Sequence, residues 1–211
     1  MTVAQKRLSF ILLFMFTFIA ASAGVVHWKM NHSLTEIIPG ELYRSSSITP
    51  RNLAELASEH NIKTVIDLRD YDSDKHDSLD IFLEAQALDS FGIRHINLPT
   101  GQVPDMETVF RFLKFLDEPD VRPVLIHCHH GIGRTGLFVA LYLIEYAGYT
   151  NEQARDLTAD HFTLRVNGRE GFRPDSDKGG FILNYQPRFG NRVEFSAETD
   201  SESKLKRGFS L

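Results

Sequence analysis

Apolar residues recur along the central part of the chain in two alternating patterns. Short runs rich in valine, isoleucine and leucine are typical of buried strands, whereas longer stretches repeat apolar residues at the three- and four-residue spacing of a helix. The runs predict strands at 40–44, 62–68, 93–98 and 124–126. The stretches predict helices at 49–60, 79–91, 104–116, 137–146 and 150–162, with a further short helix around Phe181, Ile182 and Tyr185.

Several predicted helices carry end signals of their own. Thr49 followed by Pro50 is a favourable N-cap and first helical position, and Thr150 with Gln153 forms a capping box. Gly92 stands where a C-cap would end the second predicted helix, at 79–91. The apolar residues that predict this 79–91 helix are Leu79, Phe82, Leu83, Ala87, Leu88 and Phe91.

Strands that alternate with helices predict an α/β fold. We expect a single domain with a central, mainly parallel twisted sheet of four to five strands and helices on both faces. Ligands of such sheets bind beyond the carboxyl ends of the strands. The loops after Leu68 and Leu98 should therefore share one edge with Cys128.

The first 26 residues differ in composition from this pattern. Lys6 and Arg7 precede an apolar run, and Ala21-Ser22-Ala23 matches the small-residue pattern of a signal-peptidase site. The segment is read as a cleaved signal peptide or as an uncleaved membrane anchor at residues 8–26, with a buried core helix as a third possibility. The first two readings predict a location in the cell envelope, on the extracytoplasmic side, for a protein that is anchored by a single span or exported.

The remaining boundaries follow from composition. We predict a connector at 27–36, one globular domain at 37–187 and a polar, disordered tail at 188–211. A chain of 211 residues that is 42% hydrophobic can bury one sizeable core. Its net charge of −5 argues against nucleic acid as a partner, and its single cysteine excludes an internal disulfide.

The stretch 127–136, His-Cys-His-His-Gly-Ile-Gly-Arg-Thr-Gly, carries the strongest chemical signal. It joins a predicted strand to a predicted helix, where unpaired backbone N–H groups and the helix dipole attract an anion. Its three glycines let the backbone approach an oxyanion closely, and Arg134 offers a planar fork that matches two phosphate oxygens. The same field should favour the thiolate of Cys128, which is the nucleophilic form.

Other interpretations of this stretch predict different chemistry. In one alternative, Cys128 is an inert buried side chain. In another, the loop is that of a rhodanese-like sulfur transferase. The residues 127–130 also suggest a metal site, but consecutive side chains in a tight loop point in different directions and cannot converge on one tetrahedral ion. Elsewhere, residues 70–77 are spaced as a calcium loop begins, yet Lys75 and Ile81 stand where its glycine and glutamate belong.

The spacing of Cys128, five residues, Arg134 and Thr135 resembles the signature of the cysteine-based phosphatases. Residues 42–45, 64–69, 92–93 and 123–136 are similar to the atypical dual-specificity and tyrosine phosphatases of bacteria, plants and fungi, and the likeness spans about residues 37 to 187. This resemblance implies the dual-specificity phosphatase fold. It also implies hydrolysis of phosphomonoesters through a phosphocysteine intermediate, without a metal or another cofactor.

The resemblance assigns expected roles to individual residues. Cys128 is the nucleophile, Arg134 holds the phosphate oxygens, Thr135 hydrogen-bonds the departing thiolate, and His127 bonds to backbone and orients the cysteine. The expected substrate-binding residues are His129, His130, Gly131, Ile132, Gly133, Gly136 and Arg69. Arg69 has an alternative role in a structural ion pair.

A general acid is harder to assign. Residues 98–101, Leu-Pro-Thr-Gly, occupy the place where many dual-specificity enzymes carry an aspartate. Asp105 is the nearest candidate, although an aspartate in a first helical turn also complements the helix dipole without any catalytic role. Asp160 and Asp72 are weaker candidates.

The loop composition bears on the substrate. Relatives that cleave inositol polyphosphates tend to surround the cysteine with lysine and arginine, whereas this loop carries histidines. A phosphorylated protein is the expected substrate. An inositol phosphate or phosphoinositide is the alternative, and a non-catalytic phosphate-binding module is a further hypothesis.

Overall fold

The computed structural model describes residues 14–15, 17, 34–70, 77–161 and 171–188. The chain divides into two compact units, Met1–Gly136 and Leu137–Leu211. The first unit holds the sheet and the whole of the 127–136 loop. The second holds most of helix α5 and the helices that follow it.

The sheet of the first unit has five strands in the order β1-β2-β5-β3-β4. The strands are β1 (Thr35–Ile38), β2 (Leu42–Ser46), β3 (Thr64–Asp67), β4 (Arg94–Asn97) and β5 (Val124–Cys128). Only β1 is antiparallel to its neighbour among these strands. The predicted mainly parallel sheet is therefore confirmed, with an antiparallel edge strand that the sequence did not indicate.

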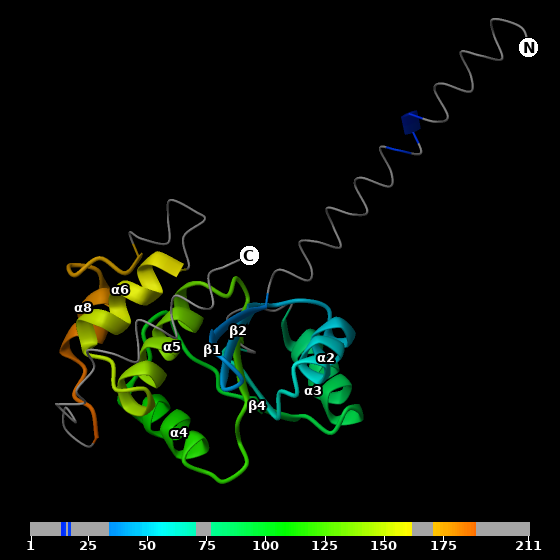
Figure 1. The fold of residues 1–211 in the computed structure, drawn as a ribbon, viewed down its shortest axis with the longest axis horizontal. Helices are drawn as coiled ribbons and strands as arrows, with labels where there is room; N and C mark the ends of the chain where they lie inside the picture. Colours follow the sequence, from blue (N-terminus) through cyan, green and yellow to red (C-terminus); the bar gives the residue numbers. More distant parts are fainter. Residues whose placement is uncertain (1–13, 16, 18–33, 71–76, 162–170, 189–211) are drawn as a thin grey trace, which may run out of the picture. The chain divides into compact units, whose positions relative to one another are not determined.

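Three helices of the first unit cover the two faces of the sheet. They are α2 (Pro50–Glu59), α3 (Asp77–Ser90) and α4 (Met106–Leu116), and α5 (Gly133–Tyr146) begins at the end of the unit. One core cluster joins Tyr43, Val65 and Leu125 of the sheet to α2 and α3. Figure 1 shows α4 on the opposite side of the sheet. Helices thus lie on both faces, as predicted.

Helix α3 leaves most of the apolar residues that predicted it exposed. Its buried side chains include Ile81, Glu84 and Leu88, whereas Leu79 and Phe82 are 63% and 55% exposed. The helix carries apolar residues around most of its circumference, so spacing alone could not show which face turns inward. The face that does turn inward carries a carboxylate.

In the second unit, α6 (Asn151–His161) and α8 (Asp177–Asn184) follow α5. The predicted capping box is present, because the Gln153 N–H donates to Thr150 Oγ1 at 3.2 Å and the Thr150 N–H to Gln153 Oε1 at 2.9 Å. The Asn151 side chain donates to the Tyr185 carbonyl at 2.7 Å and so fastens the start of α6 to the end of α8.

The membrane prediction needs correction. Among the described residues, no helix has the length and apolar character needed to cross a bilayer. This finding contradicts a single-pass anchor and the envelope location that followed from it, and neither is retained. Most of the segment 8–26, on which that prediction was based, lies outside the described residues.

Some other predictions also fall outside the described residues. The acidic stretch 71–76 and the tail from residue 189 onward are among them. The domain boundaries at 26, 36 and 187 remain predictions.

Candidate active site

The 127–136 loop connects the end of β5 to the start of α5, as the sequence predicted. Cys128 closes β5 and is 3% exposed, and Arg134 lies in the first turn of α5 and is 9% exposed. The Gly136 N–H donates to the Ile132 carbonyl at 2.9 Å and closes the first helical turn. Cysteine and arginine therefore lie on two ends of one short loop at the carboxyl edge of the sheet.

The end of β2 holds the outer side of this loop. Gly131 has a φ of +66°, and a Cβ there would lie 2.5 Å from the Ser45 carbonyl oxygen, so only glycine fits. The Ser47 N–H donates to the His129 carbonyl at 3.1 Å. Arg44 Nη1 donates to the Gly131 carbonyl at 2.7 Å. These contacts fix the backbone that a bound phosphate would meet.

Arg134 is oriented by two neighbouring loops. Its Nη1 donates to the Leu68 carbonyl at 3.0 Å and to the Thr100 carbonyl at 3.4 Å. The loops after Leu68 and Leu98 therefore share the edge with Cys128, as expected from the parallel topology.

The surroundings of Cys128 favour its thiolate. Burial raises the pKa of the thiol, but the side chain and backbone of Thr135, the charge of Arg134 and the Gly131 N–H outweigh burial and lower it below the usual range. Among the described residues, the buried Thr135 hydroxyl has no hydrogen-bond partner of ordinary geometry, so it is available to donate to the sulfur once the thiolate forms.

Arg44 is a site residue that the sequence analysis did not assign. Burial lowers its pKa to about 10, while the negative charge of a Cys128 thiolate acts in the opposite direction. A second guanidinium therefore lies within electrostatic reach of the Cys128 sulfur. Its position two residues before the end of β2, the parallel neighbour of β5, is the signal that could have revealed it.

The remaining loop residues occupy the surface of the site. His129 and His130 are exposed, and their rings meet edge to face with centroids 4.6 Å apart. Ile132 and Gly133 are half-buried. The loop thus carries two aromatic rings on its exposed side.

Asp105 caps helix α4. Its carboxylate accepts from the Thr108 N–H at 2.7 Å, and this bond lowers the pKa of the exposed carboxyl. A general acid must instead keep its proton near neutral pH. The geometry therefore supports the capping alternative, and the acid role remains a prediction. Asp72 lies outside the described residues, and Asp160 lies on α6 with its side chain undescribed.

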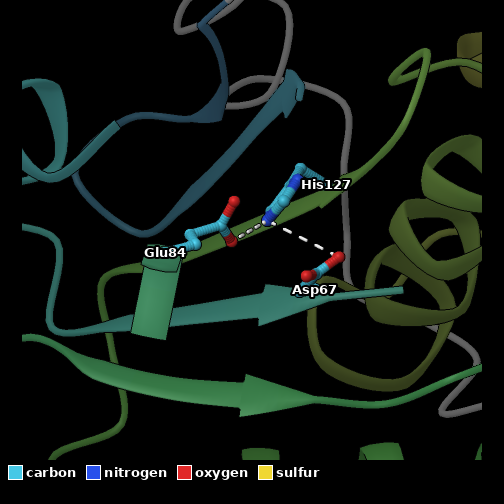
Figure 2. A group of neighbouring side chains, drawn as sticks. All are labelled: Asp67, Glu84 and His127. Atoms are coloured by element: carbon cyan, nitrogen blue, oxygen red, sulfur yellow. Dashed lines mark hydrogen bonds and ion pairs between the residues drawn. The ribbon is translucent and has the colours of Figure 1, made fainter. Parts of the chain in front are cut away.

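His127 and Arg69 do not lie where a substrate would bind. The His127 ring is fully buried with Nε2 2.8 Å from Glu84 Oε1, and among the described residues Nδ1 has no hydrogen-bond partner, so the expected bond to backbone is not found (Figure 2). The Arg69 guanidinium is 1% exposed and bonds to both oxygens of Asp67 and to Glu84 Oε2. The structural ion pair, the alternative for Arg69, is the arrangement found.

These side chains form what we call the ion cluster: Asp67, Arg69, Glu84, His95 and His127. Burial alone would lower the pKa of His127 and raise that of Glu84, but their mutual attraction reverses both shifts, and the pKa of Glu84 falls to about 2. Ligand atoms of Asp67, Glu84 and His127 lie within 4.8 Å of one another, a spacing that suits a metal ion. Because Arg69 already bonds to both carboxylates, a divalent cation would meet its positive charge, so we assign the cluster to ion pairing.

Comparisons with known proteins point to phosphatases. The family model described as a DSP-PTPase phosphatase fused to NAD+ kinase matches residues 17–170. The chain is 26% identical over 137 residues to a probable chloroplastic NAD kinase 2 of Oryza sativa, covering 65% of this chain and 13% of the relative. It is 41% identical over 66 residues to the dual specificity protein phosphatase TpbA of Pseudomonas aeruginosa, covering 29% of each. The chain therefore spans less than a third of the length of these relatives.

Solved structures show the same fold. The crystal structure of a TpbA variant from P. aeruginosa in complex with pTyr superposes with a TM-score of 0.51 at 24% identity, covering 72% of this chain and 88% of that one. The core catalytic domain of the PP-IP phosphatase SIW14 from S. cerevisiae superposes with a TM-score of 0.51 at 18% identity, covering 83% and 91%. With the family model matching most of the chain, the protein belongs to the DSP-type phosphatase family described as fused to NAD+ kinase.

Proposed function

We propose that this phosphatase hydrolyses phosphomonoesters through a phosphocysteine on Cys128 and that its substrate is a phosphorylated protein. The observation that carries the mechanism is a single, buried cysteine at the end of β5, directly before a glycine-rich loop, whose pKa is lowered. The cause of that shift is a set of donors, from Thr135, Arg134 and Gly131, that would also face a phosphate.

The reaction takes place in two displacements. The Cys128 thiolate attacks phosphorus, the bond to the leaving oxygen breaks with its electron pair, and the leaving group takes a proton from solvent. Arg134 and the loop N–H groups stabilise the charge on the equatorial oxygens. Water then attacks phosphorus and loses a proton to solvent, and the bond between sulfur and phosphorus breaks. Phosphate is released while the Thr135 hydroxyl donates to the departing thiolate.

A protein substrate is supported by the relatives and by the loop. TpbA is named a dual specificity protein phosphatase and its structure holds pTyr. The exposed rings of His129 and His130 suit the flat ring of an aryl phosphate. Aryl phosphates also have good leaving groups and need little proton assistance, which fits a site where Asp105 is occupied as a helix cap.

An inositol phosphate substrate is the second candidate. SIW14 is named a PP-IP phosphatase, and Arg44 adds a second cation near Cys128 that suits a more highly charged ligand. The non-catalytic alternative, a module that only binds phosphate, predicts affinity without turnover.

One panel of assays separates these functions. The purified protein is given an aryl phosphate, phosphotyrosine and phosphoserine peptides, inositol phosphates and phosphoinositide vesicles, and released phosphate is measured. Cys128→Ser should abolish turnover yet retain affinity for a phosphotyrosine peptide. Lys63→Ser, at the opposite edge of the sheet, is the control and should leave turnover unchanged.

Each outcome decides one claim. Equal turnover of every phosphate would contradict the preference for protein, and faster turnover of inositol phosphates would favour the second candidate. Binding without turnover in the unaltered protein would contradict the enzyme.

A further inference from the structure

The ion cluster contacts both sides of the candidate active site through the backbone. His127 immediately precedes Cys128, and successive strand residues face opposite sides of the sheet, so the histidine ring points toward α3 while the sulfur points toward the loop. Leu68 lies between two members of the cluster, and its carbonyl accepts from Arg134. Cys128 is therefore the direct chain neighbour of a cluster residue. Arg134 is one hydrogen bond away from Leu68, which lies between two cluster residues.

The Leu68 backbone is fixed on both of its flanks. The Asn97 side chain donates to the Asp67 carbonyl at 3.2 Å and to the Arg69 carbonyl at 3.0 Å, and the Leu98 N–H donates to the Asp67 carbonyl at 2.8 Å. The Leu68 N–H donates to the His127 carbonyl at 2.9 Å. The carbonyl that holds Arg134 thus lies between Asp67 and Arg69, whose side chains both belong to the ion cluster.

Glu84 is the side chain that joins His127 to Arg69. Oε1 lies 2.8 Å from His127 Nε2, and Oε2 accepts from Arg69 Nη2 at 2.6 Å. Its side chain is 1% exposed and comes from α3, whereas the other members of the cluster lie on the sheet or directly after β3. Figure 2 shows Glu84 approaching His127 from the helix while Asp67 approaches from the end of its strand.

We propose that Glu84 is a positioning residue of the phosphatase, because its carboxylate holds His127 and Arg69 at once and so sets the Cys128 loop and Arg134 relative to each other. The proposal rests on the proposed function, since it assigns a role in that same site. Glu84 does not touch the phosphate position. It acts through His127 on one side and through Arg69 and the Leu68 carbonyl on the other.

Glu84→Gln tests this role with the least change of shape. The amide still fills the space, but one of its ends becomes an N–H donor that faces either Arg69 or His127, which are themselves donors. Either the Arg69 side chain or the His127 side chain must then move. A misplacement of about 1 Å can cost on the order of 10²-fold in rate, so we expect kcat for an aryl phosphate to fall between about 10- and 100-fold.

The pKa of Cys128 gives a second measurement that does not need turnover. The chain has one cysteine, so the pH dependence of its alkylation by iodoacetamide reports this thiol alone. Removing the negative charge of Glu84 would by itself favour the thiolate and lower the thiol pKa. A rise in the thiol pKa in Glu84→Gln would therefore report displaced N–H donors.

Leu88→Ala is the matched control, because Leu88 is buried on the same helix one turn further on and lies among apolar neighbours. It should lower the unfolding temperature but leave kcat and the thiol pKa unchanged. If Glu84→Gln changes only the unfolding temperature, as the control does, Glu84 is merely structural and the proposal is overturned.

A milder variant covers the case in which Glu84→Gln does not fold. Ser47→Ala removes one hydrogen bond of 2.9 Å to Arg69 Nη1, and we expect a several-fold rise in KM with the fold retained. Unchanged kinetics in Ser47→Ala would then overturn the proposal. If the unaltered protein hydrolyses none of the phosphates, the proposed function fails, while the alkylation experiment still decides whether Glu84 positions Cys128.

Discussion

Gly131→Ala isolates the contact between the phosphate loop and the end of β2. Gly131 has a φ of +66°, and an added Cβ would lie 2.5 Å from the Ser45 carbonyl oxygen and 2.7 Å from the Ser46 nitrogen. Both are backbone atoms of a strand paired with β5, so neither can swing aside. The control is Gly40→Ala, where φ is +68° and no described atom lies within 4 Å of the new Cβ.

The two variants share one cost and differ in another. Each forces alanine into the left-handed region, which costs about 1–2 kcal/mol. Only Gly131→Ala also overpacks its surroundings, which costs a further ~1–3 kcal/mol. Urea unfolding should therefore show Gly131→Ala less stable than Gly40→Ala by that further amount.

Activity should separate the variants more sharply than stability. The added Cβ is roughly 1 Å inside the 3.4 Å at which ordinary contact begins, so the loop must move by a comparable distance. Such a shift displaces a N–H that lowers the pKa of Cys128, and a loss of about 10²-fold in kcat/KM for an aryl phosphate is expected. Gly40→Ala should keep full activity. Equal stability and equal activity of the two variants would refute the argument that β2 holds the loop.

Three further predictions concern single side chains. Asp105→Asn keeps the helix cap, so kcat for an aryl phosphate should change less than about threefold; a loss of 10²-fold or more would instead identify the general acid. Arg44→Met should raise both the Ki for inorganic phosphate and the pKa of Cys128 measured by alkylation. Arg44→Lys should restore part of each value. If neither value changes, Arg44 is not a residue of the site. Burial lowers the pKa of His95, but its ion pairs with Glu84 and Asp67, at 3.4 and 3.8 Å, raise it to about 9. Stability should therefore be highest below pH 6.5 and fall by up to about 3 kcal/mol by pH 9. Urea unfolding of His95→Gln should lack that fall.

The sequence was a good guide wherever local chemistry decides structure. Apolar runs located the parallel strands, and the spacing from Cys128 to Arg134 located the loop between β5 and α5. The sequence could place Cys128 and Arg134 on one loop because both lie within ten consecutive residues. The capping box at Thr150 was equally local and was confirmed.

Predictions failed where partners come from distant parts of the chain. Arg44 meets the Gly131 carbonyl 87 positions away, and Glu84 meets His127 43 positions away, so neither contact has a sequence signature. A glutamate inside an apolar helix looks like a solvated position until its two cationic partners are known. Arg69 was ambiguous for the same reason, since a charged strand end can line a pocket or pair with a carboxylate.

The ionisable sulfur described above is the only one of its kind in the chain. A low-pKa thiol is oxidised readily by peroxide, and in many redox-controlled proteins a neighbouring cysteine traps the sulfenic acid as a disulfide before further damage. This chain has no second thiol for that reaction. Rescue of an oxidised Cys128 therefore requires a backbone nitrogen or a thiol from outside the chain, and without either the oxidation would proceed to irreversible acids.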